Sequence, residues 1–240
     1  MVSVCMATYN GEKFIKEQLE SILSQLSTED ELVISDDSSS DLTIDVIKSV
    51  KDDRIRLFRD NKFRDPIKNF QHCLLMAKGD LIFLSDQDDV WMEGKYNKMK
   101  ELLADYDLVI SDSIIVDENL KVIEPSFFRF LGSGKGILKN MFKSSYYGSC
   151  MAFTKDILIK SLPFPDTKQI GHDLWIGLVA ELTGKVLFYD EPFLLYRRHS
   201  LAFVPTAFKS TRSFKQKILG RIIMISEITK FLIKYKWKKD

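Results

Sequence analysis

The stretch VSVCMATYNGEKFIKEQLESILSQL, residues 2–26, decides the fold class of this chain. It opens with a short apolar run that is typical of a buried strand, and it continues with helical periodicity. Its apolar side chains recur at the spacing that places them on one face of a helix: Ile15, Leu19, Ile22, Leu23 and Leu26. A buried strand followed by an amphipathic helix predicts the start of a β–α–β unit.

The same alternation continues through the first half of the chain. Further apolar runs are ELVISD (31–36), IRLFRD (55–60), DLIFLSD (80–86) and DLVISDS (107–113). Helical segments separate them at about 41–50 with Asp41 as N-cap, at 66–78 between Pro66 and Gly79, and at about 92–106. Short connections in this order predict an α/β fold, a single Rossmann-like, mostly parallel sheet flanked by helices.

The second half is less regular. YYGSCMAFT (146–154) predicts a strand, HDLWIGLVAELTG (172–184) a helix, and KVLFYDEP a strand that ends at Pro192. We expect residues 1–208 to form one catalytic domain, with a nucleotide-binding half at 1–113 and an acceptor half at 114–208. Residues 209–240 are expected to form a basic amphipathic C-terminal helix, spanning about 214–237.

Charge is divided unevenly along the chain. From Lys209 onward there are ten Lys and Arg residues against two acids, whereas residues 1–208 carry a net charge of −7. An acidic body argues against nucleic acid as a partner. The three cysteines are far apart, which fits buried thiols in a reducing compartment. Without a recognisable leader or spanning segment, we expect a cytoplasmic protein or one peripheral on the inner face of the plasma membrane.

Polar residues follow the ends of the predicted strands. Thr8 and Tyr9 follow the first, Asp37 the second, and Asp86 and Asp88 the fourth. Parallel sheets bind ligands at the carboxyl ends of their strands, so these residues are expected to converge on one crevice.

The carboxylates Asp86, Asp88 and Asp89 in FLSDQDDVW repel one another unless a positive partner lies against them. Oxygen-rich clusters of this kind suit Mg²⁺ or Mn²⁺, and Mg²⁺ usually takes one or two carboxylates together with substrate phosphates. The glycine of Asn10-Gly11-Glu12 would let the backbone approach a ligand closely. The alternative is that the three aspartates cap the helix that begins near Met92.

Five segments resemble one enzyme family in order and spacing. They are VSVCMATYNGEKFIKEQLESILSQ, LVISDDSSSDLT, AKGDLIFLSDQDDVW, GHDLW and LLYRRHS. Over roughly residues 2–200 the chain resembles the inverting family two glycosyltransferases of the A-type fold, and most of all the rhamnosyltransferase-like branch that builds bacterial surface polysaccharides.

The resemblance implies a role for each matching residue. Asp173 would be the catalytic base, Asp37 would accept from a pyrimidine N–H, and Asp88 and His199 would face the metal or diphosphate. The full set that it implies for the nucleotide sugar is Thr8, Tyr9, Asp37, Asn69, Asp86, Asp88 and Asp89. On the acceptor side it implies Trp91, His172 and Trp175.

Several of these residues have plainer interpretations. Trp91 and Trp175 could be core side chains, His172 a surface residue, and His199 a packed histidine with satisfied hydrogen bonds. The C-terminal helix has an apolar stripe of Ile218, Ile222, Ile225, Phe231, Leu232 and Tyr235 flanked by Lys and Arg. That stripe could lie in a membrane surface or pack on protein.

The expected function is metal-dependent transfer of a hexosyl or deoxyhexosyl group from dTDP-rhamnose or a UDP-sugar. The acceptor would be a growing surface polysaccharide or a lipid-linked glycan. Three alternatives fit parts of the sequence: a non-catalytic sugar-nucleotide-binding scaffold of the same fold, an aspartyl-phosphate phosphatase, and a nucleotidyltransferase. The last would need a richer Gly and Lys loop after the first strand than ATYNGEKF offers.

Overall fold

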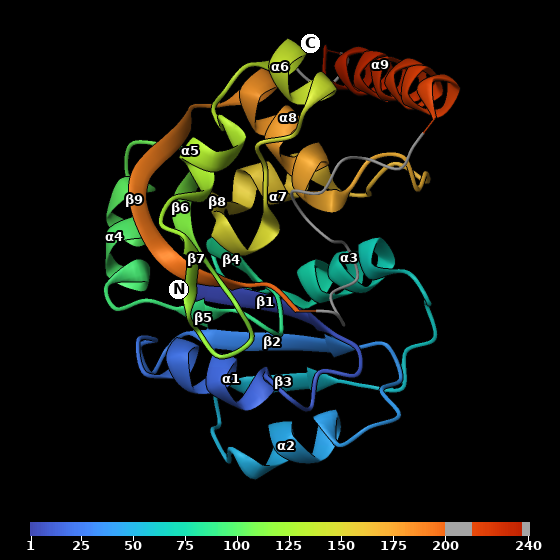
Figure 1. Ribbon diagram of the computed structural model, residues 1–240. Coiled ribbons are helices and arrows are strands. Elements are labelled where there is room, and N and C mark those ends of the chain that lie inside the picture. The colour runs from blue at the N-terminus through green and yellow to red at the C-terminus, as the bar shows by residue number, and fades with distance from the viewer. Residues whose placement is uncertain (200–212, 237–240) are drawn as a thin grey trace.

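A computed structural model describes residues 1–199 and 213–236 (Figure 1). The helices are α1 (Ile15–Leu23), α2 (Thr43–Ser49), α3 (Pro66–Met76), α4 (Lys95–Leu102), α5 (Phe127–Leu131), α6 (Ile137–Phe142), α7 (Lys155–Ser161), α8 (His172–Thr183) and α9 (Phe214–Lys236). The strands are β1 (Val2–Thr8), β2 (Glu31–Asp36), β3 (Ile55–Phe58), β4 (Leu81–Ser85), β5 (Val90–Trp91), β6 (Leu108–Val116), β7 (Val122–Glu124), β8 (Met151–Thr154) and β9 (Val186–Arg197).

The described strands form one sheet in the order β3-β2-β1-β4-β8-β6-β9-β5, with β7 paired to β6. The first four strands pair in parallel, as the sequence predicts. The direction in which successive strands are added to the sheet reverses after β3, so that β4 pairs with the other side of β1. This reversal makes a topological switch point between β1 and β4, where α/β sheets bind ligands. The predicted α/β fold is confirmed.

The second half joins the same sheet with mixed direction. β8 lies between β4 and β6 and is antiparallel to both, whereas β9 runs parallel to β6. The predicted strand at 146–154 begins only at Met151, because Gly148–Cys150 forms a 3₁₀ turn.

β9 does not end at Pro192, as the sequence predicted, but continues to Arg197. The pairing of β6 with β9 jumps from Ser111↔Tyr189 to Asp112↔Pro192, so Asp190 and Glu191 form a bulge. Proline has no backbone N–H to donate, but the hydrogen bonds between the strands are interrupted at the bulge. The strand can therefore continue past Pro192. This continuation carries Arg197 and His199 back to the sheet edge.

Helices cover both faces of the sheet. α1 buries Ile15, Leu19, Ile22 and Leu23, as predicted, and contacts α2, whereas α3 packs on β1 and β2. Right-handed crossovers place α3 on the face opposite α1 and α2, because the strand added after β3 lies on the other side of β1. The helix expected at 92–106 is shorter and spans Lys95–Leu102. The three cysteines are buried free thiols, as expected.

α9 packs beside α6 at one end of the molecule (Figure 1). Its side chains Met224 and Phe231 face the domain, and Phe231 contacts Trp175 edge-on at 5.9 Å. No helix within residues 1–199 and 213–236 is long and apolar enough to cross a membrane. The division into catalytic halves at 113 and 208 stays a prediction.

Candidate active site

The carboxyl ends of β1, β2 and β4 meet at the switch point. The Asp37 N–H donates to the Thr8 carbonyl at 3.0 Å. Across the switch, Gln87 Oε1 accepts from the Tyr9 N–H at 2.9 Å and Gln87 Nε2 donates to the Tyr9 carbonyl at 3.0 Å. The fold therefore brings together the strand-end residues that the sequence placed in one crevice.

Gly11 was expected to let the backbone approach a ligand, but the structure gives another reason for a glycine at this position. A Cβ there would lie 2.4 Å from Gln87 Oε1, so the glycine makes room for the side chain that joins the β1 and β4 loops.

Asp37 orders the loop that follows β3. Its carboxylate accepts from the N–H of Phe63 at 2.6 Å and of Asp65 at 3.3 Å. A carboxylate has about four acceptor positions, so capacity remains for a ligand donor. Asn69 is buried, and its amide donates to the Thr8 carbonyl at 3.2 Å while accepting from Ser35 Oγ at 2.7 Å. Asn69 therefore joins the carboxyl ends of β1 and β2 through hydrogen bonds.

The aspartate cluster is held from behind by protein groups. Ser149 Oγ donates to Asp86 Oδ2 at 2.7 Å, and Asp89 Oδ1 accepts from the Arg197 N–H at 3.0 Å. Asp89 is 1% exposed, and its second oxygen is buried without a hydrogen-bond partner in the structure. The cluster does not cap α4, whose N-cap is Gly94 with no side-chain hydrogen bond.

Two buried cationic side chains lie near this cluster and bind main-chain carbonyls around it. Lys95 is fully buried, donates from Nζ to the Ser149 carbonyl at 2.5 Å, and lies 4.7 Å from the Trp91 ring centroid. Arg197 is 4% exposed and donates from Nε to the Asp88 carbonyl at 2.7 Å. Sequence analysis missed both residues.

Arg197 also connects more distant segments. Its Nη1 donates to the Glu118 carbonyl at 2.7 Å, its Nη2 pairs with Glu17, and its guanidinium lies over the Phe14 ring. One side chain therefore ties β9 to the aspartate loop, to the start of α1 and to the turn after β6.

Burial shifts the titration of this cluster. Desolvation, followed by the charges of Asp88 and Asp173, raises the pKa of Asp86 to about 7. Burial and the charges of Asp88 and Asp86 raise the pKa of Asp89 well above its usual range. Desolvation also lowers the pKa of Lys95 to about 8. At neutral pH these groups therefore carry less charge than their count suggests.

Asp88 and His199 point at each other across the site. Asp88 Oδ2 lies 2.9 Å from His199 Nε2, and the imidazole packs on Phe14 at a centroid distance of 4.6 Å. The imidazole Nδ1 is buried without a hydrogen-bond partner in the structure. The sequence predicted that these two residues face the same ligand, and the structure brings them together.

This pair fits a divalent cation whose remaining ligands come from a substrate. Within the described residues, no three His, Cys, Asp or Glu side chains are grouped so that they could hold a metal by themselves. Mg²⁺ and Mn²⁺ accept carboxylate oxygens, and Mg²⁺ is typically held by one or two protein ligands plus phosphates and water. Asp88 provides one such carboxylate oxygen, and His199 adds an imidazole nitrogen beside it.

Asp173 lies in the first turn of α8, and its Oδ1 accepts from the Leu174 N–H at 2.7 Å. Its negative charge contributes to the raised pKa of Asp86. The neighbouring His172 stacks on Phe70 at a centroid distance of 4.0 Å, and burial lowers its pKa. Its Nε2 is buried without a hydrogen-bond partner, so His172 is not the surface residue that one interpretation suggested.

Both tryptophans expected on the acceptor side are buried. Trp91 is 3% exposed and packs on Phe83 at a centroid distance of 5.7 Å. Trp175 is 5% exposed, and its indole N–H donates to the Ser161 carbonyl at 3.0 Å. These positions favour the core interpretation that the sequence left open.

The residues that sequence analysis missed had weak signals. Lys95 lies four residues before the buried Met99 on the inner face of α4, so helical spacing could have placed it inside. Arg197 lies beyond the β9 bulge, where the alternation of strand residues is broken, so no periodicity marked it. Ser149 lies in the 3₁₀ turn that the sequence had assigned to a strand.

Comparison with known proteins identifies the family. The model of Glycosyl transferase family 2 matches residues 3–162. This chain therefore belongs to glycosyltransferase family 2, which confirms the resemblance seen in its motifs. Enzymes of this family transfer sugars from nucleotide sugars to glycan or lipid-linked acceptors.

Two curated relatives of this chain are named for different sugar donors. It is 28% identical over 181 residues to the UDP-Glc:alpha-D-GlcNAc-diphosphoundecaprenol beta-1,3-glucosyltransferase WfaP of Escherichia coli, covering 75% of this chain and 71% of the relative. It is also 28% identical over 211 residues to the dTDP-rhamnosyl transferase RfbG of Shigella flexneri, covering 81% and 71%.

Solved structures share the fold. Residues 1–349 of S. aureus TarS in complex with UDP-GlcNAc match with a TM-score of 0.70 at 19% identity, over 90% of this chain and 64% of that one. The mannosyltransferase PcManGT from Pyrobaculum calidifontis, in complex with GDP-Man and Mn²⁺, matches with a TM-score of 0.62 at 18% identity, over 84% and 58%. This chain thus spans less than two thirds of both solved chains.

Proposed function

We propose that this protein is an inverting, metal-dependent transferase that moves a hexosyl or deoxyhexosyl group from a nucleoside-diphosphate sugar to a surface polysaccharide or lipid-linked glycan. The observation that carries the proposal is the Asp88–His199 pair, 2.9 Å apart, whose aspartate follows β4 beside the other polar strand ends. The names of the relatives support UDP-glucose and dTDP-rhamnose as the donors to test first.

The donor would lie along the strand ends. Its base would approach Thr8, Tyr9 and Asp37, and its diphosphate would approach Asp88 and His199. A divalent cation bound by Asp88 and His199 would act as a Lewis acid on the departing diphosphate. Buried Lys95 and Arg197 hold the aspartate loop in place before the donor arrives, which reduces the cost of ordering on binding.

Asp173 supplies the base. The acceptor hydroxyl gives its proton to the Asp173 carboxylate while its oxygen bonds to the anomeric carbon. The bond from that carbon to the diphosphate oxygen breaks, and the nucleoside diphosphate leaves. A single displacement of this kind inverts the anomeric configuration. Base catalysis typically contributes about 10²–10⁴-fold, or ~3–5 kcal/mol of barrier.

Asp173→Asn tests the base. It should lower the transfer rate about 100-fold or more, because the amide cannot accept the proton, while donor affinity stays within about twofold. Steady-state transfer assays and calorimetry measure the two quantities. Asp190→Asn, at an exposed position of β9, is the matched control and should transfer normally. Near-normal turnover of Asp173→Asn would exclude this residue as the base.

Asp88→Ala tests the metal site. It should abolish the part of donor binding that depends on Mn²⁺, because His199 alone offers one protein ligand. Calorimetric titration of UDP-glucose and dTDP-rhamnose with Mn²⁺ and with EDTA measures this difference. If the variant keeps the native affinity under both conditions, the metal assignment is wrong.

Family membership bears on the other functions considered. The scaffold and phosphatase alternatives have no observation in their favour beyond the motif that suggested them. Release of nucleotide from the donor without acceptor would separate an enzyme from a scaffold. A cytoplasmic location, with an acceptor presented at the inner face of the plasma membrane, is part of this proposal.

A further inference from the structure

Exposed apolar side chains gather on two neighbouring helices far along the chain from the nucleotide-binding residues. We name this surface the α6–α9 face; its members are Leu138 and Phe142 of α6 and Phe214, Ile218, Leu219, Ile222, Ile225 and Ile233 of α9, each 41–76% exposed. We propose that the α6–α9 face docks on the surface of an anionic lipid bilayer. This inference goes beyond sugar transfer and does not depend on it.

α9 has two apolar faces, not the single stripe that its sequence suggested. The inner face holds Gly220, Met224 and Phe231, and it packs on the domain through Trp175. The outer face holds Ile218, Ile222 and Ile225, at 41%, 58% and 54% exposure. Packing on protein therefore accounts for the inner face and leaves the outer one uncovered within the described chain.

The outer face of α9 continues onto α6. The Arg221 guanidinium lies 4.4 Å from the centroid of the Phe142 ring. Ile218 and Ile225 are three residues before and four after Arg221, so they adjoin on the helix surface the residue that contacts Phe142. The exposed apolar residues of the two helices thus form one patch rather than scattered side chains.

Charge around the patch selects the occupant. Residues 125–148, which contain α6, hold four Lys and Arg and no acid, and residues 213–236 hold six against Glu227 alone. Glu227 pairs with Lys230 at 2.7 Å. Apolar side chains among basic ones fit the surface of a bilayer that has an apolar hydrocarbon interior and acidic headgroups. A second copy docked symmetrically would bring this basic surface against itself.

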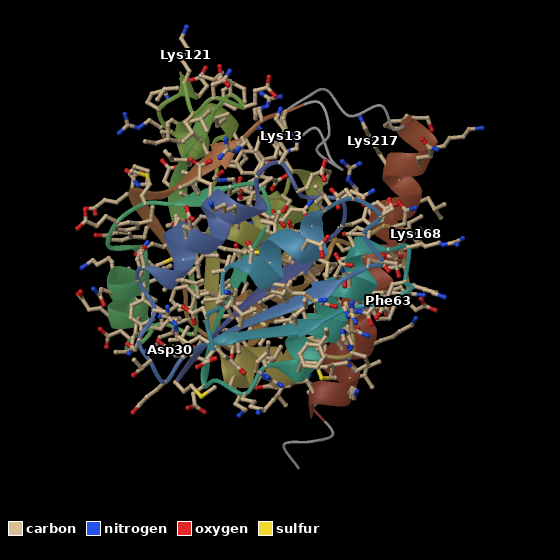
Figure 2. All side chains as sticks on the ribbon, turned by 90° about the horizontal axis from the view of Figure 1, so that it is seen from below. Lys13, Asp30, Phe63, Lys121, Lys168 and Lys217 are labelled. Atoms are coloured by element: carbon tan, nitrogen blue, oxygen red, sulfur yellow. The ribbon has the colours of Figure 1, made fainter. Side chains whose placement is uncertain are left out.

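The patch lies near the acceptor side of the site. A Cβ at Gly220 of α9 would lie 3.4 Å from Gln169 Oε1, and α8 with His172 and Asp173 begins three residues after Gln169. Lys168 and Lys217 lie on the same side of the molecule (Figure 2). A bilayer against the α6–α9 face would therefore lie near the base that receives an acceptor.

Vesicle flotation tests the proposal. The full chain should float with vesicles of phosphatidylcholine mixed with phosphatidylglycerol, and weakly with phosphatidylcholine alone. The double variant Ile222→Asp/Ile225→Asp should lower the partition coefficient about tenfold or more, and Leu138→Asp on α6 should lower it several-fold. Leu42→Asp/Leu75→Asp, at positions 60% and 59% exposed elsewhere, is the matched control and should float like the native chain.

The outcomes separate the occupants. Failure of the native chain to float on anionic vesicles would overturn the proposal, as would native flotation by the Ile222→Asp/Ile225→Asp variant. A concentration-dependent dimer in sedimentation, abolished by the same variant, would assign the face to a second copy instead. Each variant should keep the native unfolding midpoint and native Mn²⁺-dependent donor binding. If the native chain does not bind the donor, that result would count against the proposed function and would not affect the flotation result.

Discussion

At the scale of residues, the aspartate cluster combines partly buried and fully buried carboxylates with different contacts. Asp88 points toward His199, whereas Asp89 is buried and receives the Arg197 N–H. Asp86 accepts a hydrogen bond from Ser149 Oγ. Environment therefore divides three adjacent acids whose chemistry is identical in the sequence.

Asp86→Asn tests this division through stability. With the pKa of Asp86 raised to about 7, the folded state keeps its proton at pH values where the unfolded chain has lost it. Native stability should therefore fall as pH rises from about 4 to 7, by roughly 3 kcal/mol for this group. Asn avoids that loss, so the variant should be the more stable protein at pH 8, and its advantage should vanish near pH 4.

Urea unfolding at pH 4, 6 and 8 measures the effect. Asp60→Asn, at an exposed aspartate, is the control and should keep the native pH profile. A variant whose stability follows the native one across this range would show that Asp86 titrates normally in the folded protein.

At the scale of elements, Arg197 fixes where β9 ends relative to the aspartate loop. Its guanidinium donates to the carbonyls of Asp88 and Glu118, and it pairs with Glu17 of α1. These segments lie far apart in the chain, and a planar group with several donors can join them where a point charge cannot.

Arg197→Met should lower the free energy of unfolding by about 2–4 kcal/mol, because it leaves buried acceptors unpaired. It should also weaken Mn²⁺-dependent donor binding about tenfold, since the Asp88 carbonyl loses its support. Arg197→Lys should recover less than half of either loss. Urea unfolding and calorimetry give both numbers, with Arg59→Met, at a half-exposed arginine, as the control. Equal stability of Arg197→Met and the native chain would refute this role.

At the scale of the whole molecule, most of the residues proposed to bind the donor follow strands of the parallel half of one sheet. The proposed base Asp173 lies on α8, the helix that precedes β9. Figure 1 shows this sheet in the middle of the molecule, with α8 and α9 near one end. A ligand that contacts both regions should stabilise the folded state as a unit, because it binds only when both are in place.

Thermal unfolding with donor and Mn²⁺ measures that coupling. At donor concentrations about 100 times Kd, binding should add about 2.7 kcal/mol. For a chain of this size, that corresponds to a rise in Tm of roughly 5–10 °C. EDTA should remove the shift. A shift that persists in EDTA would contradict a metal-dependent donor site.

Much of this protein could be predicted from local patterns. The βα alternation, the α1 face and the polar strand ends are short-range features, so the parallel half of the sheet followed from them. The aspartate cluster and its neighbours were also visible, because strand ends in such a sheet share an edge. The antiparallel insertion of β8 was not visible, since a short apolar run looks the same in either direction.

The sequence by itself determined the fold class, the family and the sheet edge where the polar strand ends meet, because periodicity and motifs can be read along the chain. The tertiary structure alone decided which cationic side chains lie beside the aspartate loop. Arg197 lies 109 residues from Asp88, and only the β9 bulge and the sheet bring them together. It also decided that both tryptophans belong to the core, and that α9 keeps a second apolar face open. Burial and long-range pairing depend on how the whole chain closes on itself, and no local pattern contains that information.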